Sequence, residues 1–75
     1  MTRLQAEIII GLCRNGLSKS KTARALYRGR NTVLYHIQKI KESTGKDPMD
    51  FYDMIELEKK ARQVLGYAVQ QEETT

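Results

Sequence analysis

The sequence predicts an all-α protein, a small three- to four-helix bundle that contains a helix-turn-helix. Apolar residues recur at intervals of three and four along four successive segments, which is the pattern of one buried helix face. No segment alternates apolar and polar residues over a useful length, so strands are not expected. The chain has 75 residues, which is enough for one small domain with a thin core.

The first helix is expected from Arg3 to Arg14. Its inward face is formed by Leu4, Ile8 and Leu12. Thr2 can cap its start, and Asn15-Gly16 can end it. Ile10 points away from the apolar face, so it is expected to be exposed or to contact a partner.

Two further helices are expected over Ser18 to Leu26 and Asn31 to Ser43. Ser18 and Asn31 are suitable N-caps, and the small Ala23 allows another helix to approach closely. Val33, Ile37 and Ile40 form the inward face of the later helix, which ends at Gly45. In the break between the two helices, Tyr27 is expected in the core and Gly29 is expected to accept a positive φ.

The fourth helix is expected to begin at Asp47-Pro48, since Asp can cap a helix and Pro fits its first turn. The inward positions of this helix are Met54, Leu57, Ala61 and Leu65. The pattern extends in part as far as Val69. Residues 1–66 are therefore interpreted as the folded domain and residues 67–75 as a flexible polar tail.

Positive charge is concentrated in the middle of the chain. The net charge is +4, yet residues 18–41 contain seven Lys or Arg and no acidic residue. Such a surface attracts polyanions. The alternative is a solvated face that only keeps the protein in solution.

Several classes of function are disfavoured. With one Cys and one His, the chain can form neither an intramolecular disulfide nor a zinc cluster. No convergent catalytic set appears, so no enzyme, cofactor or metal site is expected, and no small-molecule ligand is expected either. No apolar run approaches the roughly 20 residues that a membrane span needs. The lone Cys13, interpreted as a small buried residue, suits a reducing cytoplasm, where the protein would associate with the nucleoid.

The spacing of the apolar residues indicates a helix-turn-helix. Leu26 follows Ala23 by three residues, Val33 follows it by ten, and Ile37 comes next. In this motif a small residue lets the two helices cross closely. The second helix, here about residues 31–43, then enters the major groove of DNA.

A longer motif runs through this skeleton. It comprises Thr22-Ala23-Arg24-Ala25-Leu26-Tyr27, then Arg30-Asn31-Thr32-Val33, Tyr35, Ile37, Lys39-Ile40 and Ser43-Thr44-Gly45. The motif resembles the C-terminal helix-turn-helix domain of PucR/CdaR-type bacterial transcriptional regulators and, more distantly, Fis-type domains. Family members usually have an apolar residue and His where this chain has Arg28 and Gly29, and often Arg where it has Leu34 and His36.

The resemblance implies a sequence-specific regulator that binds double-stranded DNA. Family members are usually long and have a sensory region before this domain. This chain begins at Met1, close to the domain boundary. It is therefore expected to be either a standalone small regulator, of the kind that phages and mobile elements encode, or a fragment of a longer protein.

The expected DNA contacts come from the two helices of the motif and the break between them. They are Lys19, Ser20, Lys21, Arg28, Arg30, Asn31, Thr32, Leu34, Tyr35 and Lys39. Arg30 suits guanine, Asn31 adenine, and Leu34 a thymine methyl group. The others suit phosphates, while Thr32 suits either a phosphate or a thymine methyl group. Asn31 could instead serve only as a cap, and Tyr35 could lie along the protein surface.

Two partner hypotheses remain open. A homodimer on two half-sites would supply the specificity that one small motif lacks, with the edge of Phe51 and Ile55, or Ile10, as its interface. Alternatively, the acidic C-terminal helix could make the chain a protein-interaction adaptor whose helix-turn-helix is only a scaffold.

Overall fold

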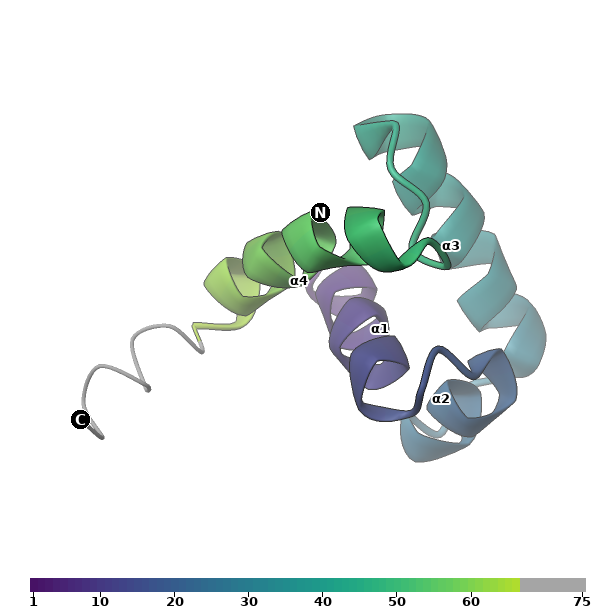
Figure 1. Ribbon diagram of the computed structural model, residues 1–75. Coiled ribbons are helices and arrows are strands. Elements are labelled where there is room, and N and C mark those ends of the chain that lie inside the picture. Colours follow the sequence, from purple (N-terminus) through teal and green to yellow (C-terminus); the bar gives the residue numbers. More distant parts are fainter. Residues whose placement is uncertain (67–75) are drawn as a thin grey trace.

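The computed structural model describes residues 1–66, which form four helices and no strand (Figure 1). The helices are α1 (Arg3–Arg14), α2 (Lys19–Ala25), α3 (Arg30–Thr44) and α4 (Phe51–Leu65). The all-α prediction is confirmed. The predicted polar tail and the predicted extension to Val69 lie outside the described residues.

Helix α1 is the centre of the fold. It contacts α2, α3 and α4, whereas α2 and α3 also contact each other and α4 packs on α1 alone among the described helices. The core residues that α1 contributes are Ala6, Ile8, Ile9, Ile10 and Leu12. A helix that is covered on several sides is apolar around most of its circumference.

The expected exposure of Ile10 is therefore wrong. Its side chain is only 6% exposed. It borders a shallow hollow shared with Leu26, beyond the end of α2, and Leu65 of α4. The helical spacing of α1 reveals its strongest apolar face but not that neighbouring helices cover the flanks as well.

Several helix ends follow the predicted capping. Thr2 and Gln5 form a capping box, in which the Gln5 amide donates to the Thr2 hydroxyl over 3.1 Å. The Ser18 hydroxyl accepts from the Lys21 amide, also over 3.1 Å. Gly45 ends α3 with a φ of 71°, a left-handed conformation that glycine adopts without strain. These features fix the starts of α1 and α2 and the end of α3.

Two predicted helix starts are wrong. Helix α3 begins at Arg30 with Gly29 as its N-cap, and Asn31 lies inside the first turn because the Gly29 carbonyl already accepts from the Thr32 and Val33 amides. Helix α4 begins at Phe51, since Asp50 is the residue whose carboxylate accepts from the Tyr52 and Asp53 amides, over 2.9 and 3.1 Å.

The predicted start of α4 is instead a turn that leads into the helix. The Asp47 carboxylate accepts from the Met49 amide over 2.9 Å, and the Asp47 amide donates to the Asp53 carboxylate over 3.0 Å. Pro48 is buried. Lys46, just before this turn, forms a 2.7 Å ion pair with Glu56 of α4. This contact raises the pKa of Lys46 and lowers that of Glu56.

Helices α1 and α2 approach each other closely at Gly11. A Cβ atom at Gly11 would lie 2.8 Å from Cγ2 of Thr22. Thr22 is fully buried, so its branched side chain has little room to move. Gly11 thus serves the packing of α2, which has only seven residues and is too short to be stable alone.

We expect Gly11→Ala to destabilise the protein. Overpacking costs about 1–3 kcal/mol, and the higher helix propensity of alanine offsets roughly 1 kcal/mol of this. The free energy of unfolding, measured by urea denaturation, should therefore fall by about 1 kcal/mol. In a Thr22→Ser background, which lacks Cγ2, the same substitution should cause no loss. Equal losses in both backgrounds would contradict the assigned contact.

Candidate nucleic-acid interface

Helices α2 and α3 with the residues between them form a helix-turn-helix. Ala23 of α2 and Val33 and Ile37 of α3 are buried, as their spacing predicts. Leu26, which follows α2, packs against the edge of the same core. These apolar contacts leave the opposite face of α3 open to solvent.

The turn differs from the prediction at Tyr27 and Gly29. Gly29 has a φ of −69°, and the left-handed residue is Tyr27, with a φ of 55°. Tyr27 is also 96% exposed, so its predicted core position is wrong. Two hydrogen bonds explain the conformation. The Arg28 amide donates to the Ala23 carbonyl over 2.9 Å and the Tyr27 amide to the Arg24 carbonyl over 3.2 Å, which is the Schellman pattern that usually places glycine at this position.

The exposed face of α3 has a regular pattern of polar side chains. Its outermost positions are Asn31, Tyr35, Gln38 and Glu42, all exposed and spaced at i, i+4, i+7 and i+11. We call these four residues the α3 outer face. Gln38 was not among the predicted contacts, although its spacing of seven from Asn31 places it on the same face as Asn31 and Tyr35.

The side chains at the middle of α3 contact one another. The rings of Tyr35 and His36 meet edge to face at 5.2 Å, and Lys39 Nζ lies 5.5 Å from the centre of the Tyr35 ring. Lys39 is also 3.7 Å from the Glu42 carboxylate, which accepts a 3.3 Å hydrogen bond from the Gln38 amide group. Tyr35 and Lys39 border a shallow hollow against the first residues of the chain.

The remaining predicted contacts surround the start of α3. Ser20 and Lys21 on α2, Arg28 in the turn and Arg30 at the start of α3 are all exposed, whereas Lys19, Thr32 and Leu34 are half-buried. All ten predicted residues therefore lie on α2, the turn and α3.

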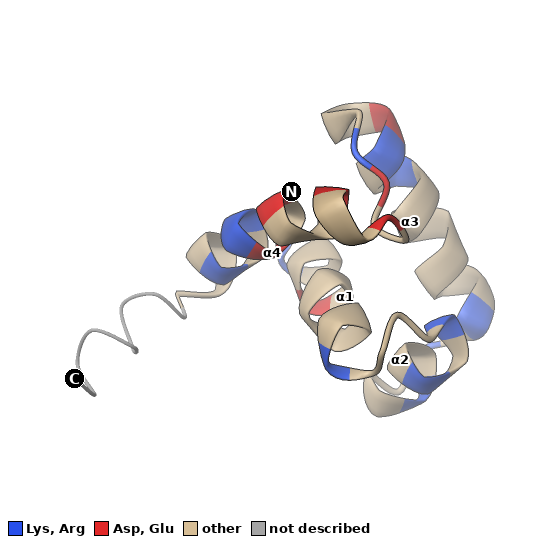
Figure 2. Cartoon of the chain, in the orientation of Figure 1, with Lys and Arg blue, Asp and Glu red and all other residues tan. Residues whose placement is uncertain are grey.

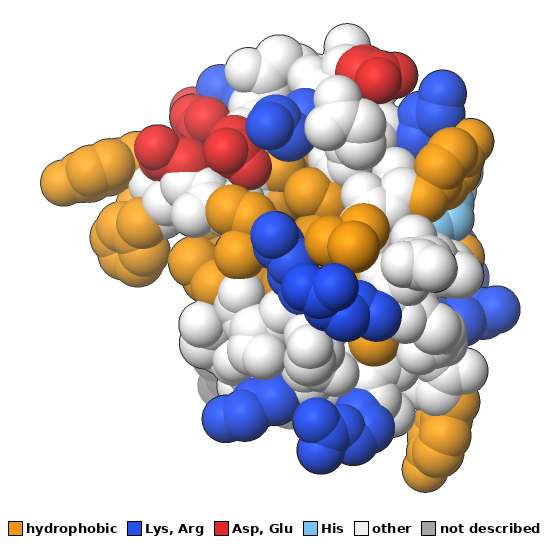
Figure 3. Space-filling model, turned by 90° about the vertical axis from the view of Figure 1, so that its right-hand side faces the viewer, with side chains coloured by type: hydrophobic (Ala, Val, Ile, Leu, Met, Phe, Trp, Pro, Cys, Tyr) orange, Lys and Arg blue, Asp and Glu red, His pale blue; other side chains and the backbone are white. Residues whose placement is uncertain are grey.

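Basic residues predominate on α2, the turn and the start of α3, whereas α4 has residues of both signs. Lys and Arg cover α2 and the start of α3, whereas acidic residues gather around the loop before α4 and its first turns (Figure 2). Figure 3 shows the α2 and α3 side, where basic side chains lie across the middle and lower part and also near the top, and acidic ones lie at the upper left and upper right. Within residues 1–66, Lys19, Lys21, Arg24, Arg28 and Arg30 form no ion pair. A surface of this kind attracts a polyanion.

The fold and this basic surface define a helix-turn-helix domain. The model of the PucR C-terminal helix-turn-helix domain family matches residues 6–61, and the chain belongs to that family. The protein is therefore a DNA-binding domain of the transcription-regulator class, a class that is in general not enzymatic. No curated protein and no solved structure matches the sequence significantly.

No group of three or more His, Cys, Asp or Glu side chains within residues 1–66 could hold a metal ion. None of the helices there is long and apolar enough to cross a membrane.

We expect Tyr27→Asn to stabilise the domain. The left-handed conformation costs a residue with a Cβ atom about 1–2 kcal/mol, and asparagine tolerates it better than tyrosine. The exposed ring contributes little packing in return. Thermal unfolding should show a gain of up to about 1 kcal/mol for Tyr27→Asn and a loss of similar size for the β-branched Tyr27→Val. A loss in both variants would indicate that the ring stabilises the fold.

Proposed function

We propose that this protein is a sequence-specific regulator of transcription that inserts α3 into the major groove of double-stranded DNA. The observation that supports this most directly is the α3 outer face, whose exposed polar side chains follow Arg28 and Arg30, two cations that form no ion pair within residues 1–66. A helix with its side chains is about 10–12 Å wide, and the major groove of about 12 Å accepts one such helix.

Five residues of α3 suit contacts with base edges. Arg30 can bond O6 and N7 of guanine, while Asn31 and Gln38 can each bond N6 and N7 of adenine. Leu34 can contact a thymine methyl group with the part of its side chain that remains exposed. Thr32 can contact either a thymine methyl group or a phosphate. These residues lie mostly in the first half of α3, the part that enters the groove in other domains of this architecture.

The flanking contacts are assigned to phosphates. Lys19, Ser20, Lys21 and Arg28 lie before α3 in the chain, and Tyr35 and Lys39 lie along its middle. Cations, hydroxyl groups and amides beside a recognition helix fix its position on the DNA without selecting a sequence.

Glu42 limits how much of α3 the DNA can contact. Its carboxylate is on the α3 outer face and bonds Gln38 and Lys39, which compensates part of its charge. A negative charge close to phosphates weakens DNA binding. We therefore assign the base contacts to the helix up to about Lys39, and we expect Glu42 to oppose the approach of phosphates to its last turns.

Useful specificity needs more than one such domain. One small module buries little surface on DNA, and helix-turn-helix proteins normally bind two half-sites about one helical turn apart. We propose a homodimer on DNA, with residues 1–66 as the folded unit and the bacterial nucleoid as its location.

We expect reversal of the basic charges to abolish DNA binding. Replacing Lys21 and Arg30 by Glu should remove binding to a random duplex in fluorescence anisotropy. If about five of the seven central cations contact phosphates, log affinity of the unaltered protein should fall with log salt at a slope of about −4.5. Arg3→Glu, at an exposed arginine on α1 outside the assigned DNA contacts, is the matched control and should retain the slope.

Sequence preference is tested by sequencing the bound fraction of a random duplex pool. Enrichment of a palindrome is expected, and Arg30→Ala should cost about 1–3 kcal/mol on the enriched site and relax one base position. Binding without enrichment would contradict sequence-specific recognition. If the Lys21 and Arg30 reversal left regulation intact, the helix-turn-helix would be a scaffold and the chain a protein-interaction adaptor.

We expect Glu42→Gln to strengthen DNA binding. The substitution removes a negative charge that repels the phosphates. In water, two unit charges about 4 Å apart interact by about 1 kcal/mol. Affinity for a random duplex at low salt should rise by roughly fivefold. Glu42→Asp keeps the charge and should show no such gain. Equal affinity for both variants would place the end of α3 away from the DNA.

A further inference from the structure

Helix α4 has more exposed large apolar side chains than any other helix of residues 1–66. Of the seven exposed large hydrophobic side chains in residues 1–66, four lie on α4, namely Phe51, Tyr52, Ile55 and Val64. Phe51 is 67% exposed and Ile55 43%. The buried face of the same helix, formed by Met54, Leu57 and Ala61, contacts only α1 among the described helices. The outer face of α4 therefore has no partner within this part of the chain.

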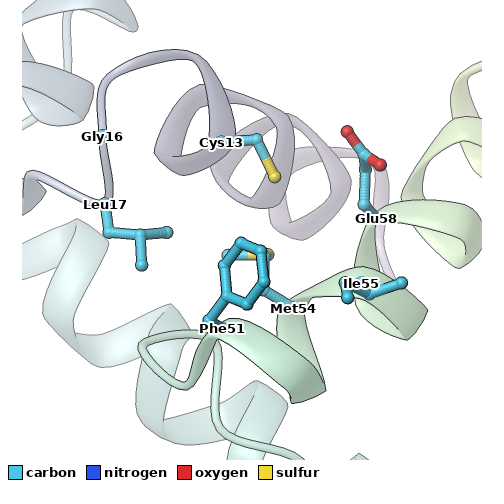
Figure 4. A pocket seen from close by; sticks show the side chains of 7 residues that line it. All are labelled: Cys13, Gly16, Leu17, Phe51, Met54, Ile55 and Glu58. Carbon is cyan, nitrogen blue, oxygen red and sulfur yellow. The ribbon is translucent and has the colours of Figure 1, made fainter.

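Part of this exposed surface forms a groove against the end of α1. It has a volume of about 440 Å³. Figure 4 shows Cys13 and Leu17 on the α1 side, with Phe51, Met54 and Ile55 on the α4 side and the Glu58 carboxylate at the edge. We call this the α4 groove. Burial, and after it the Glu58 carboxylate, raises the pKa of the Cys13 thiol, so the α1 wall of the α4 groove is uncharged at neutral pH.

The charges along α4 favour one particular occupant. Asp50 and Asp53 are at its start, and Lys59 and Lys60 are in its second half, whereas Glu56 and Glu58 already form ion pairs with Lys46 and Arg62. Two copies of α4 that cross antiparallel place the acidic half of each helix beside the basic half of the other. A parallel pair would instead place like charges together, which is unfavourable.

We propose that the α4 groove, with the exposed side chains of Phe51, Tyr52 and Ile55 beside it, binds a second copy of this chain, with the two α4 helices antiparallel about a twofold axis. The same surface then serves both subunits, as in most homodimers. The choice of a second copy rests partly on the proposed function, because two half-sites require two domains. Helix α4 makes no contact with α3 in the monomer, and Figure 1 shows the two helices on different sides of α1.

Sedimentation velocity of the whole chain tests the proposal. The unaltered protein should form a dimer at concentrations up to about 1 mM, a range that includes weak specific association. Ile55→Glu should make it monomeric, because a carboxylate would be buried in the contact. The matched control is Val64→Glu, also on α4 and 41% exposed but outside the α4 groove, which should remain dimeric. Circular dichroism should show both variants folded.

The orientation has its own test. Reversing Lys59 and Lys60 to Glu places acidic residues against acidic residues in an antiparallel pair and should abolish the dimer. In a parallel pair, Lys59 and Lys60 would lie beside the same two residues of the other copy. Reversing both to Glu would replace one like-charge repulsion by another, so the stability of the dimer would not change. A dimer that survives the reversal would therefore overturn the antiparallel arrangement.

Two other outcomes would overturn the proposal. If the unaltered chain stays monomeric at concentrations up to about 1 mM, a second copy does not bind the α4 groove. Equal dissociation by Ile55→Glu and Val64→Glu would show a general effect of added charge.

These failures are distinguishable from failure of the proposed function. Ile55→Glu retains every assigned DNA contact, so it should bind a random duplex with an unchanged salt slope whether or not the dimer exists. Loss of DNA binding by an intact dimer would instead count against the proposed function alone.

Discussion

The fold depends on the burial of α1 between three other helices. Ile8, Ile9 and Leu12 are fully buried because α2, α3 and α4 all pack on this one helix. A chain this short has only a thin core, so few side chains provide most of its stability. The close contact between Gly11 and Thr22 sets how near α2 can lie, and α2 in turn supports the start of α3. The packing of α2 on α1 therefore influences where α3 lies.

Electrostatics divide the surface into two regions. Cations without acidic partners lie on α2, the turn and the start of α3, whereas the ion pairs Lys46–Glu56 and Glu58–Arg62 involve α4. Exposed ion pairs add little to stability, so their main effect here is to neutralise part of the charge along α4. The unpaired cations produce a directional field that favours approach of DNA to one side of the domain.

The sequence is sufficient to predict the helices and the helix-turn-helix, because their apolar spacing and caps are local signals. Thr2, Ser18 and Gly45 end their helices as predicted. The misplaced residues depend on other parts of the fold. Ile10 lies beside Leu26, beyond the end of α2, and Leu65 of α4. Tyr27 is exposed because the backbone leaves α2 at this residue in a left-handed conformation. Residue type alone predicts that conformation at glycine and not at tyrosine. Gln38 was not predicted as a DNA contact, although its position seven residues after Asn31 places both on one helix face.

The α3 outer face contributes nothing to the core, since all four of its side chains are exposed. The residues of the α3 outer face that we propose to contact bases and the residues that maintain the fold are therefore different sets on the same helix. Substitutions on this face are expected to change stability only slightly. Such a domain can acquire a new DNA target through few mutations while its folding is preserved, so its recognition can diverge quickly between related regulators and can be altered deliberately by engineering.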